Sequence, residues 1–350
     1  MIFRQITAVI RLEMTKTFLS RRGIWTYLLA LAPVLIFLGH SFNEMRSAEQ
    51  RAQWAAARTV PTADLKSITP GMSRLDVEVA VGEPHRKTVR RGNFNVAVYE
   101  YTDGSNVFRF VFVNDKVNNV SVDERDSLAA DSLIFATVFQ FFYLRLAVFF
   151  GCVGVFTNLF RGELVQKSLH FYLLTPMRRE VLMIGKYVAG LIATIVIFCG
   201  STMLQILALA WHVDSQELAA FLAGGGWATV ASYVGVTAAA CVGYGSVFLA
   251  AGLLFRNPIM PAAFVLAWEG ANIFLPSTLK HISVIFYLQS LCPVIAPPEA
   301  DIPRLLRYLI TSSEPASVTV AILGLLGVTA ALLFLAGNLA RRLEINYSAD

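Results

Sequence analysis

The sequence predicts an α-helical membrane protein that carries one small α+β domain near its N-terminal end. The chain has 350 residues, of which 56% are hydrophobic and 15% charged, and its mean hydropathy is +0.58. A soluble domain is about half apolar and about a quarter charged, so this chain is too apolar and too poor in charge to be one. Its apolar residues also gather in long runs, which one polar block at 41–131 interrupts.

The first 22 residues predict an amphipathic helix that lies in the membrane interface. Apolar residues recur at helical spacing from Ile2 to Phe18, while cations such as Arg11 lie on the other faces. The apolar run that follows is just long enough to cross a bilayer, so residues 23–40 are the first predicted transmembrane helix. A cleavable signal peptide is the alternative, but the basic lead-in is too long and LGHSF offers no small-residue cleavage site.

Residues 41–131 predict a soluble insert that starts with a polar, Ala-rich helical stalk up to about residue 59. Ser73 is a favourable N-cap for a short helix, and Gly82 followed by Pro84 ends it. Asp103-Gly104 is the strongest hairpin signal in the chain. We expect a helix followed by a three- or four-stranded antiparallel meander, with strands over 95–102, 106–113 and 117–122.

A basic run precedes the first of these strands, with residues His85, Arg86, Lys87, Arg90 and Arg91. It could bind phosphate or polysaccharide, but a solvated loop is the commoner role of such a run. Aromatic residues alternate along the strands between Tyr99 and Phe112, and this spacing predicts a sheet core rather than a ligand platform.

The motifs ITPGMS, GEP and FVNDKV, all between residues 68 and 117, resemble the small domain of the SmpA/OmlA-type outer-membrane assembly lipoproteins. The resemblance implies a domain that binds partners, has no catalytic group and lies outside the cytoplasm. No lipobox cysteine is present, so flanking transmembrane helices would tether the domain. Long domains are translocated despite their charge, so the basic residues of the insert agree with that location.

Residues 132–350 predict five further transmembrane helices, at 132–160, 187–211, 227–255, 259–276 and 317–339. The part at 277–316 is apolar enough for another span, but Lys280, His281 and Gln289 interrupt it. A further span would also place Arg341 outside, against the positive-inside rule. We therefore expect re-entrant or surface-lying outer helices at 277–316, and six spans with both termini in the cytoplasm.

The stretch RGELVQKSLHFYLLTPMRREVLMIGK, residues 161–186, lies between the second and third predicted spans. Its Lys and Arg residues place it on the cytoplasmic side. Leu164, Ser168 and Phe171 recur at helical spacing, and Pro176 ends the pattern. The stretch therefore predicts a short amphipathic helix at the membrane surface, with an ordinary basic loop as the alternative.

The order FRGELVQKSL, LLTPMRRE and then GK resembles the type-2 ABC exporter permeases. In that family this segment, here 161–175, is the coupling helix, which docks in a cleft of a separate ATP-hydrolysing subunit. The resemblance implies contact with that subunit by Arg161, Glu163, Lys167, His170, Thr175, Pro176, Arg178 and Arg179. It also implies a bacterial inner-membrane protein that exports an amphipathic, lipid-linked or polymeric substrate, together with a second copy or a homologous permease.

The chain itself carries no motif for nucleotide or metal chemistry. The position where a Walker A motif needs its first glycine is Glu180, and no Gly-rich nucleotide fingerprint, HExxH motif or Cys/His cluster is present. We therefore expect no catalytic, cofactor or metal site here, with ATP and Mg²⁺ bound by the partner ATPase. The basic residues cluster at span ends, which indicates anionic membrane lipid rather than nucleic acid.

Two ionisable residues lie inside predicted spans, where charge is costly and usually functional. Arg145 lies in the middle of the second span, and Glu269 lies in the outer half of the fifth, close to Asn272. They predict a polar feature of a translocation cavity, with a structural ion pair or a snorkelling arginine as the alternatives. An ion-coupled carrier is disfavoured, because it would need more such charges and an internal repeat. A non-transporting scaffold whose insert binds envelope-assembly partners is the alternative function.

Overall fold

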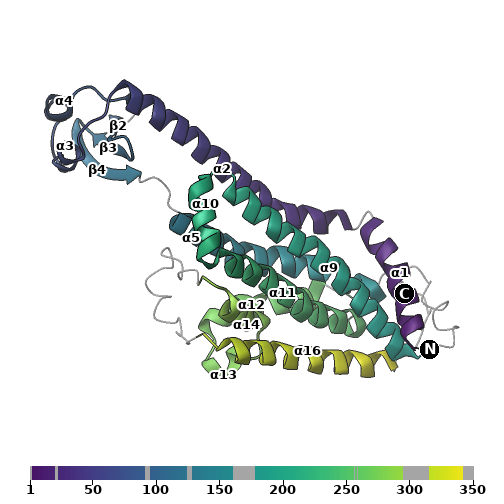
Figure 1. The fold of residues 1–350 in the computed structure, drawn as a ribbon. Helices are drawn as coiled ribbons and strands as arrows, with labels where there is room; N and C mark the ends of the chain where they lie inside the picture. Colours follow the sequence, from purple (N-terminus) through teal and green to yellow (C-terminus); the bar gives the residue numbers. More distant parts are fainter. Residues whose placement is uncertain are drawn as a thin grey trace. The chain divides into compact units, whose positions relative to one another are not determined.

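The computed structural model describes residues 2–19, 23–90, 95–123, 128–160, 178–255, 257, 259–294 and 315–341. The chain divides into two compact units: unit 1 comprises Met1–Leu38 and Ser132–Asp350, and unit 2 comprises Gly39–Asp131. Unit 1 is helical and unit 2 contains the sheet (Figure 1). The predicted first span and the predicted stalk form one continuous 34-residue helix, α2 (Ile24–Ala57), so the polar residues after His40 continue the helix that the apolar residues begin.

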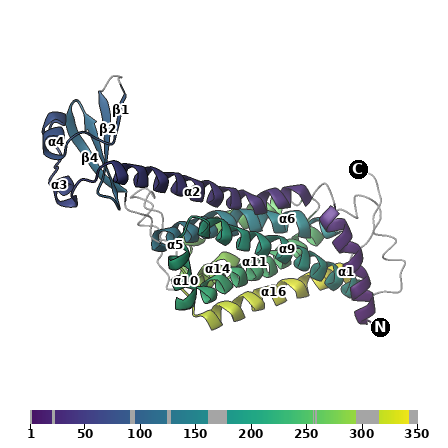
Figure 2. The same ribbon diagram turned by 45° about the horizontal axis from the view of Figure 1, so that its top comes forward.

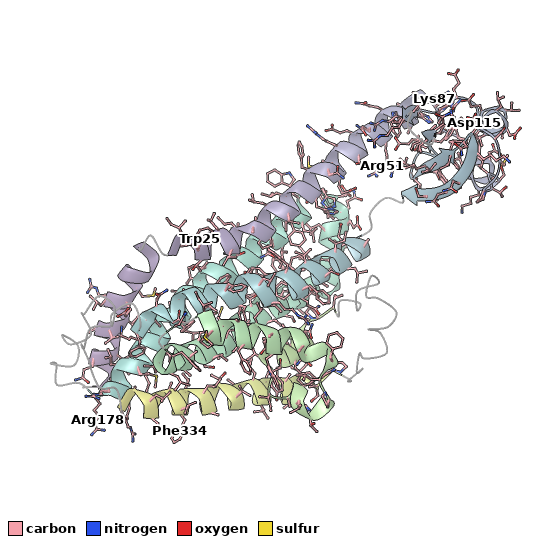
Figure 3. The ribbon with its side chains drawn as sticks, turned by 180° about the vertical axis from the view of Figure 1, so that it is seen from behind. Trp25, Arg51, Lys87, Asp115, Arg178 and Phe334 are labelled. Atoms are coloured by element: carbon pink, nitrogen blue, oxygen red, sulfur yellow. The ribbon has the colours of Figure 1, made fainter. Side chains whose placement is uncertain are left out.

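Five helices of the described residues are long and apolar enough to cross a membrane. Three of them are single helices: α2, α9 (Arg179–Ala210) and α16 (Val318–Arg341). The span Ala130–Phe160 begins within α5 (Leu128–Thr137) and continues through η2 (Val138–Val148) and α6 (Phe149–Phe156). The span Ser215–Leu254 consists of α10 (Ser215–Phe221), η3 (Leu222–Gly226) and α11 (Trp227–Leu254). Apolar side chains such as Trp25 and Phe334 project from their outer faces (Figure 3), as expected where lipid is the solvent.

The predicted span at 259–276 is shorter than expected. It consists of the 13-residue helix α12 (Ile259–Ala271) and the 3₁₀ turn η4 (Asn272–Phe274). At about 1.5 Å per residue, α12 is about 20 Å long, whereas the hydrocarbon core of a bilayer is about 30 Å thick. Two short helices follow, α13 (Ser277–Lys280) and α14 (Val284–Leu291), in the region where outer helices were predicted; residues 295–314 of that region lie outside the described residues.

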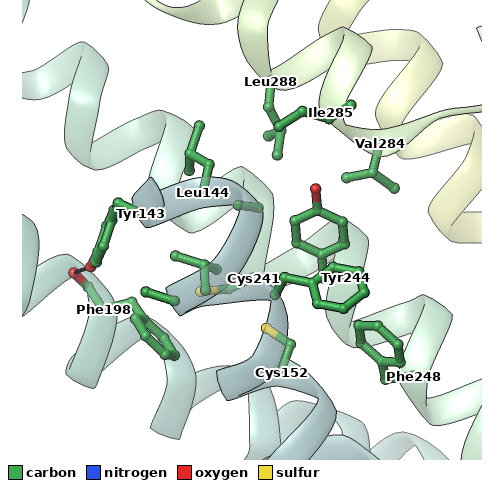
Figure 4. Close-up of a cluster of buried hydrophobic side chains, with 14 of the residues drawn as sticks. Tyr143, Leu144, Cys152, Phe198, Cys241, Tyr244, Phe248, Val284, Ile285 and Leu288 are labelled. Atoms are coloured by element: carbon green, nitrogen blue, oxygen red, sulfur yellow. Dashed lines mark hydrogen bonds between the residues drawn. The ribbon is translucent and has the colours of Figure 1, made fainter. Parts of the chain in front are cut away.

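The core of unit 1 is packed around small residues of α11, as the Gly- and Ala-rich sequence of this helix predicts. A methyl group at Gly252 would lie 3.0 Å from the Cα atom of Thr157, so the two backbones approach closely there. Gly245 lies in the same way against the ring of Phe156. Elsewhere in the core, the Tyr143 hydroxyl donates to the carbonyl oxygen of Phe198 at 2.6 Å (Figure 4).

Unit 2 is a four-stranded antiparallel sheet in the order β1-β2-β3-β4, with two short helices. Its elements are α3 (Thr62–Lys66), α4 (Arg74–Val81), β1 (Arg86–Arg90), β2 (Val96–Thr102), β3 (Val107–Val113) and β4 (Lys116–Asp123) (Figure 2). The alternating aromatic residues of β2 and β3 form its core together with Leu65 of α3 and Val77 of α4. The prediction that these aromatic residues are sheet core is confirmed.

The basic run at 85–91 was expected to be a solvated loop, and this expectation is wrong for its central part. Residues Arg86–Arg90 form β1, which pairs with β2 along its whole length. All five residues of β1, an edge strand, are exposed. An exposed, basic strand of this kind has no apolar alternation, so periodicity could not predict it.

The two hairpin turns that lie entirely within the described residues follow from their residue types. Gly104 adopts a φ of +101°, in the left-handed region that glycine favours, and the carboxylate of Asp103 accepts hydrogen bonds from the amides of Ser105 and Asn106. Asn114 and Asp115 also have positive φ values, as the tight turns of two-residue hairpins require. The Asp103-Gly104 hairpin prediction is confirmed.

The helix α4 begins with a capping box. The Ser73 hydroxyl accepts a hydrogen bond from the amide of Asp76 at 3.2 Å, and the Asp76 carboxylate accepts one from the amide of Ser73 at 3.1 Å. Hydrogen bonds from the Ser73 hydroxyl and amide also hold the pKa of Asp76 below its usual value. The predicted N-cap is therefore confirmed.

Replacing the cap tests this assignment. Ser73→Ala removes a hydrogen-bonded N-cap, so the free energy of local opening of α4 should fall by about 1 kcal/mol. Amide hydrogen exchange of residues 74–81 in the full chain, embedded in nanodiscs, measures it. Ser67→Ala is the control, because the Ser67 hydroxyl only donates to the carbonyl of Asp64 at an exposed position. Equal exchange in both variants would contradict the role of Ser73.

Candidate functional site

Most of the predicted ATPase-contact segment lies outside the described residues, namely Arg161, Glu163, Lys167, His170, Thr175 and Pro176. The structure describes the remaining two contact residues. Arg178 lies at the end of the bundle where α9 begins (Figure 3). The Arg179 guanidinium donates to the carbonyl of Arg341 at 3.0 Å, and Arg341 forms an ion pair with Glu180. These contacts hold the start of α9 against the end of α16.

A buried lysine joins the two ends of this segment. Lys186 on α9 is fully buried, and its Nζ atom donates to the carbonyl oxygen of Leu159 at 2.8 Å. Leu159 lies two residues before the segment begins, and Lys186 lies shortly after it ends. The same ammonium group lies 5.4 Å from the ring of Phe160. Lys186 therefore connects the end of the second predicted span to the start of the third.

The charge of Lys186 is balanced by the N-terminal helix. Glu13, which is 3% exposed, lies on α1 (Ile2–Leu19), and its Oε1 accepts a hydrogen bond from Lys186 Nζ at 2.7 Å. A buried ammonium group in apolar surroundings is costly unless it is paired and hydrogen-bonded. The ion pair therefore attaches α1 to the helical bundle. The amphipathic sequence of α1 predicts only that this helix lies in the membrane interface.

Gly185 makes this approach of α1 feasible. A methyl group at Gly185 would lie 3.0 Å from both Cβ and Cγ1 of Val9, closer than most real contacts of this kind. The missing side chain thus lets the backbone of α9 lie directly beneath α1, one residue before Lys186. The sequence prediction did not include Glu13. The sequence did contain a signal for such a pair. Glu13 is the only acidic residue of α1, and the other charged residues of this helix are cations.

Glu269 caps a short helix. Its carboxylate, 4% exposed, accepts hydrogen bonds from the Ser283 hydroxyl at 2.7 Å and from the amides of Val284 and Ile285 at 3.0 Å and 2.8 Å. These amides form the first turn of α14 and have no partner within that helix. A carboxylate from α12 therefore caps α14, where the helix dipole also favours negative charge.

The other end of α14 is also anchored. The Gln140 side chain of η2, 2% exposed, donates to the carbonyl oxygen of Val294 at 2.7 Å. Gly324 of α16 lies against the ring of Tyr287, and Gly243 of α11 lies against Val284. Figure 4 shows Val284, Ile285 and Leu288 beside the core residues of α11. Sequence analysis missed Gln140, because an amide in an apolar span does not reveal its partner.

Arg145 lies in η2, an eleven-residue π-helical segment. Such segments are rare and often occur at functional sites. Its guanidinium lies 5.1 Å from the ring centre of Phe141. The hydrogen bonds from Ser283, Val284 and Ile285 account for the position of the Glu269 carboxylate. Asn272 is buried, and the described residues provide no hydrogen-bond partner for its Nδ2.

Comparisons of the chain with protein-family models, with curated proteins and with solved structures gave no match. The two anchored features therefore have to be interpreted from their own geometry. One is Lys186, whose hydrogen bond to the Leu159 carbonyl joins the flanks of segment 161–175 and whose ion pair with Glu13 adds α1. The other is the Glu269 cap, which fixes α14 between α11, α12 and α16.

Removing the Glu269 carboxylate should loosen α14 selectively. Glu269→Ala leaves three buried donors without an acceptor, and each unsatisfied donor costs about 1–3 kcal/mol. We expect hydrogen exchange of residues 284–291 to accelerate by at least about a hundredfold, which corresponds to about 2.7 kcal/mol. Asn272→Ala is the control, because the Nδ2 of Asn272 has no hydrogen-bond partner among the described residues. Unchanged exchange in Glu269→Ala would contradict the capping role.

The Glu13–Lys186 pair should show strong coupling in a double-mutant cycle. Glu13→Leu or Lys186→Met alone leaves one buried charge unpaired, at a cost of about 3–5 kcal/mol in unfolding free energy. The double variant should recover a large part of this loss, because both charges are then absent. SDS-induced unfolding in detergent micelles measures each value.

The exposed pair Glu180–Arg341 is the matched control for this cycle, with side chains 36% and 64% exposed. Glu180→Leu and Arg341→Met should each cost no more than about 1 kcal/mol, since solvent screens exposed ion pairs. Equal losses at the two pairs would show that burial does not determine the contribution of Lys186.

Proposed function

We propose that the chain is the transmembrane permease subunit of an ATP-driven type-2 ABC exporter. A separate ATPase subunit energises it through segment 161–175, and a second permease copy or a homologous permease completes the transporter. The chain crosses the bacterial inner membrane six times with both termini in the cytoplasm, and the short helix α12 makes the fifth crossing where the bilayer is locally thinner. Unit 2 is an extracytoplasmic domain inserted between the first and second spans.

The observation that supports this proposal most is the position of Lys186. A segment that transmits the movement of an ATPase must be firmly attached at both ends, or its movement would be lost in the connections. Lys186 binds the Leu159 carbonyl on one side of segment 161–175 and lies within α9 on the other side. Glu13 adds α1 to the same attachment.

The charges at this end of unit 1 agree with a cytoplasmic location. Arg178, Arg179 and Arg341 lie where α9 begins and α16 ends. Cationic side chains resist translocation and bind the anionic lipids of the cytoplasmic leaflet. The acidic partner of Arg341, Glu180, lies beside them and does not reverse the local charge.

In this function, ATP binding closes two ATPase subunits against each other and moves the coupling segments. Lys186 carries this movement into the second and third spans and into α1. The helices of the bundle then shift to open a path for an amphipathic, lipid-linked or polymeric substrate. Glu269 keeps α14 at the end of α12 during this movement, so the outer part of the path retains its shape.

Affinity purification of the intact protein from cells that also express the neighbouring genes tests this function. We expect a nucleotide-binding subunit to co-purify and to hydrolyse ATP. Glu163→Ala or Arg178→Ala should reduce its recovery by about tenfold or more, which corresponds to the loss of about 1.4 kcal/mol of contact energy. Lys66→Ala on α3 of unit 2 is the control and should leave recovery unchanged.

A pure preparation with no ATPase partner and no nucleotide turnover would overturn the proposed function. It would favour instead a membrane scaffold that does not transport and whose extracytoplasmic domain binds envelope-assembly partners.

A further inference from the structure

One face of the sheet in unit 2 is not covered by its helices. The inner face carries the aromatic core, so the residues between those core positions point to the outer face. Four of these are valines, Val96 and Val98 on β2 and Val111 and Val113 on β3. The register pairs Val96 with Val113 and Val98 with Val111, so the four side chains form one contiguous block, here called the valine face.

The valine face belongs to neither of the two hydrophobic clusters formed by the described residues. Each of its four side chains has intermediate exposure, as expected for valines on an uncovered sheet that shield only one another. An apolar patch that is rimmed by polar residues is typical of an interaction site.

Cations surround the valine face. Arg90 on β1 pairs in register with Val96, and Lys116 on β4 pairs with Val113, so these two cations lie at opposite ends of one row across the sheet. Both are exposed, and neither forms an ion pair with another described residue. With strands about 4.8 Å apart, the two Cα atoms are separated by about 14 Å.

A second row carries three further charges. Glu100 on β2 lies between Arg86 on β1 and Arg109 on β3, with its carboxylate 2.9 Å from Arg109 and 3.8 Å from Arg86. The side chains of Arg86 and Arg109 remain 57% and 45% exposed. The register also places Asp123 of β4 on this face, opposite Val107 of β3. Four cations against the two carboxylates of Glu100 and Asp123 leave the outer face with a net positive charge, which favours a negatively charged partner.

Two occupants fit this face poorly. A second copy in the same orientation would bring like charges together, which costs free energy. A bilayer surface is usually bound through protruding Trp, Phe or Leu side chains, whereas the valines here lie between longer Arg and Lys side chains and do not protrude. A protein surface with its own apolar centre meets both requirements of the face.

We propose that the outer face of this sheet is a docking site for an acidic protein. The contact region of that protein has an apolar centre that covers the valine face. Asp or Glu side chains flank this centre about 14 Å apart, so that they reach Arg90 and Lys116. The proposal does not depend on ATPase coupling, because it concerns unit 2 alone.

Photo-crosslinking in cells tests the proposal on the full chain. A benzoylphenylalanine residue in place of Val98 should give one discrete protein adduct. The same residue in place of Val79 should give none, although Val79 is 85% exposed, because it lies on α4 rather than on the outer sheet face. Mass spectrometry then identifies the adduct, and the purified protein is titrated against the chain in nanodiscs.

The charge dependence of this titration decides the outcome. Arg90→Glu/Lys116→Glu should weaken binding at least tenfold and flatten its salt dependence, whereas Arg46→Glu/Lys66→Glu should leave both unchanged. The ATPase assay is run on the same variants and should not respond to either. Adducts to phospholipid or to a second copy, binding that ignores the charge reversal, or no adduct at Val98 would each overturn the proposal.

Discussion

The architecture of unit 1 depends on neutralising one ammonium group in an apolar interior. Lys186 has no access to water, so its charge requires a carboxylate and further acceptors from the protein. Glu13 and the Leu159 carbonyl provide them, and each belongs to a different helix. The requirement therefore selects how three helices meet, and Gly185 removes the steric obstacle to that arrangement. Apolar packing alone would allow these helices to slide, because lipid tails solvate them equally well.

The same principle explains the part of unit 1 that does not span. Short helices expose a large share of unpaired backbone groups at their ends, and such groups are costly when buried. In α14, the Glu269 carboxylate accepts hydrogen bonds from amides of the first turn, and the Gln140 side chain donates to the carbonyl of Val294, just after the last turn. Two intramembrane polar side chains thus support backbone that is not part of a long helix. Glu269, which was predicted as a polar feature of a cavity, thus also supports the local backbone structure.

The sequence predicted long regular features better than paired ones. Apolar runs, the Ser73 cap and the Asp103-Gly104 turn each contain their signal within a few consecutive residues, and the structure has them as expected. β1 was missed because an exposed basic edge strand has no apolar period. Glu13 with Lys186, and Glu269 with α14, are separated by 173 and by 14 to 16 residues, and no local pattern records which polar group meets which. The sequence also did not predict that α12 ends at Ala271. Residues 259–276 have the composition of a span, so the early end of the helix depends on packing.

The composition of β1 has a further effect on the behaviour of unit 2 in solution. An edge strand presents unpaired amides and carbonyls that can join the sheet of another molecule. In β1 all five residues are exposed, and Arg86, Lys87 and Arg90 carry positive charge. Two such edges at a strand spacing of about 4.8 Å would bring six cations together, and the repulsion opposes the first step of sheet-to-sheet aggregation. The residues that hide the strand from sequence analysis thus protect the domain against self-assembly while the chain is being folded and inserted.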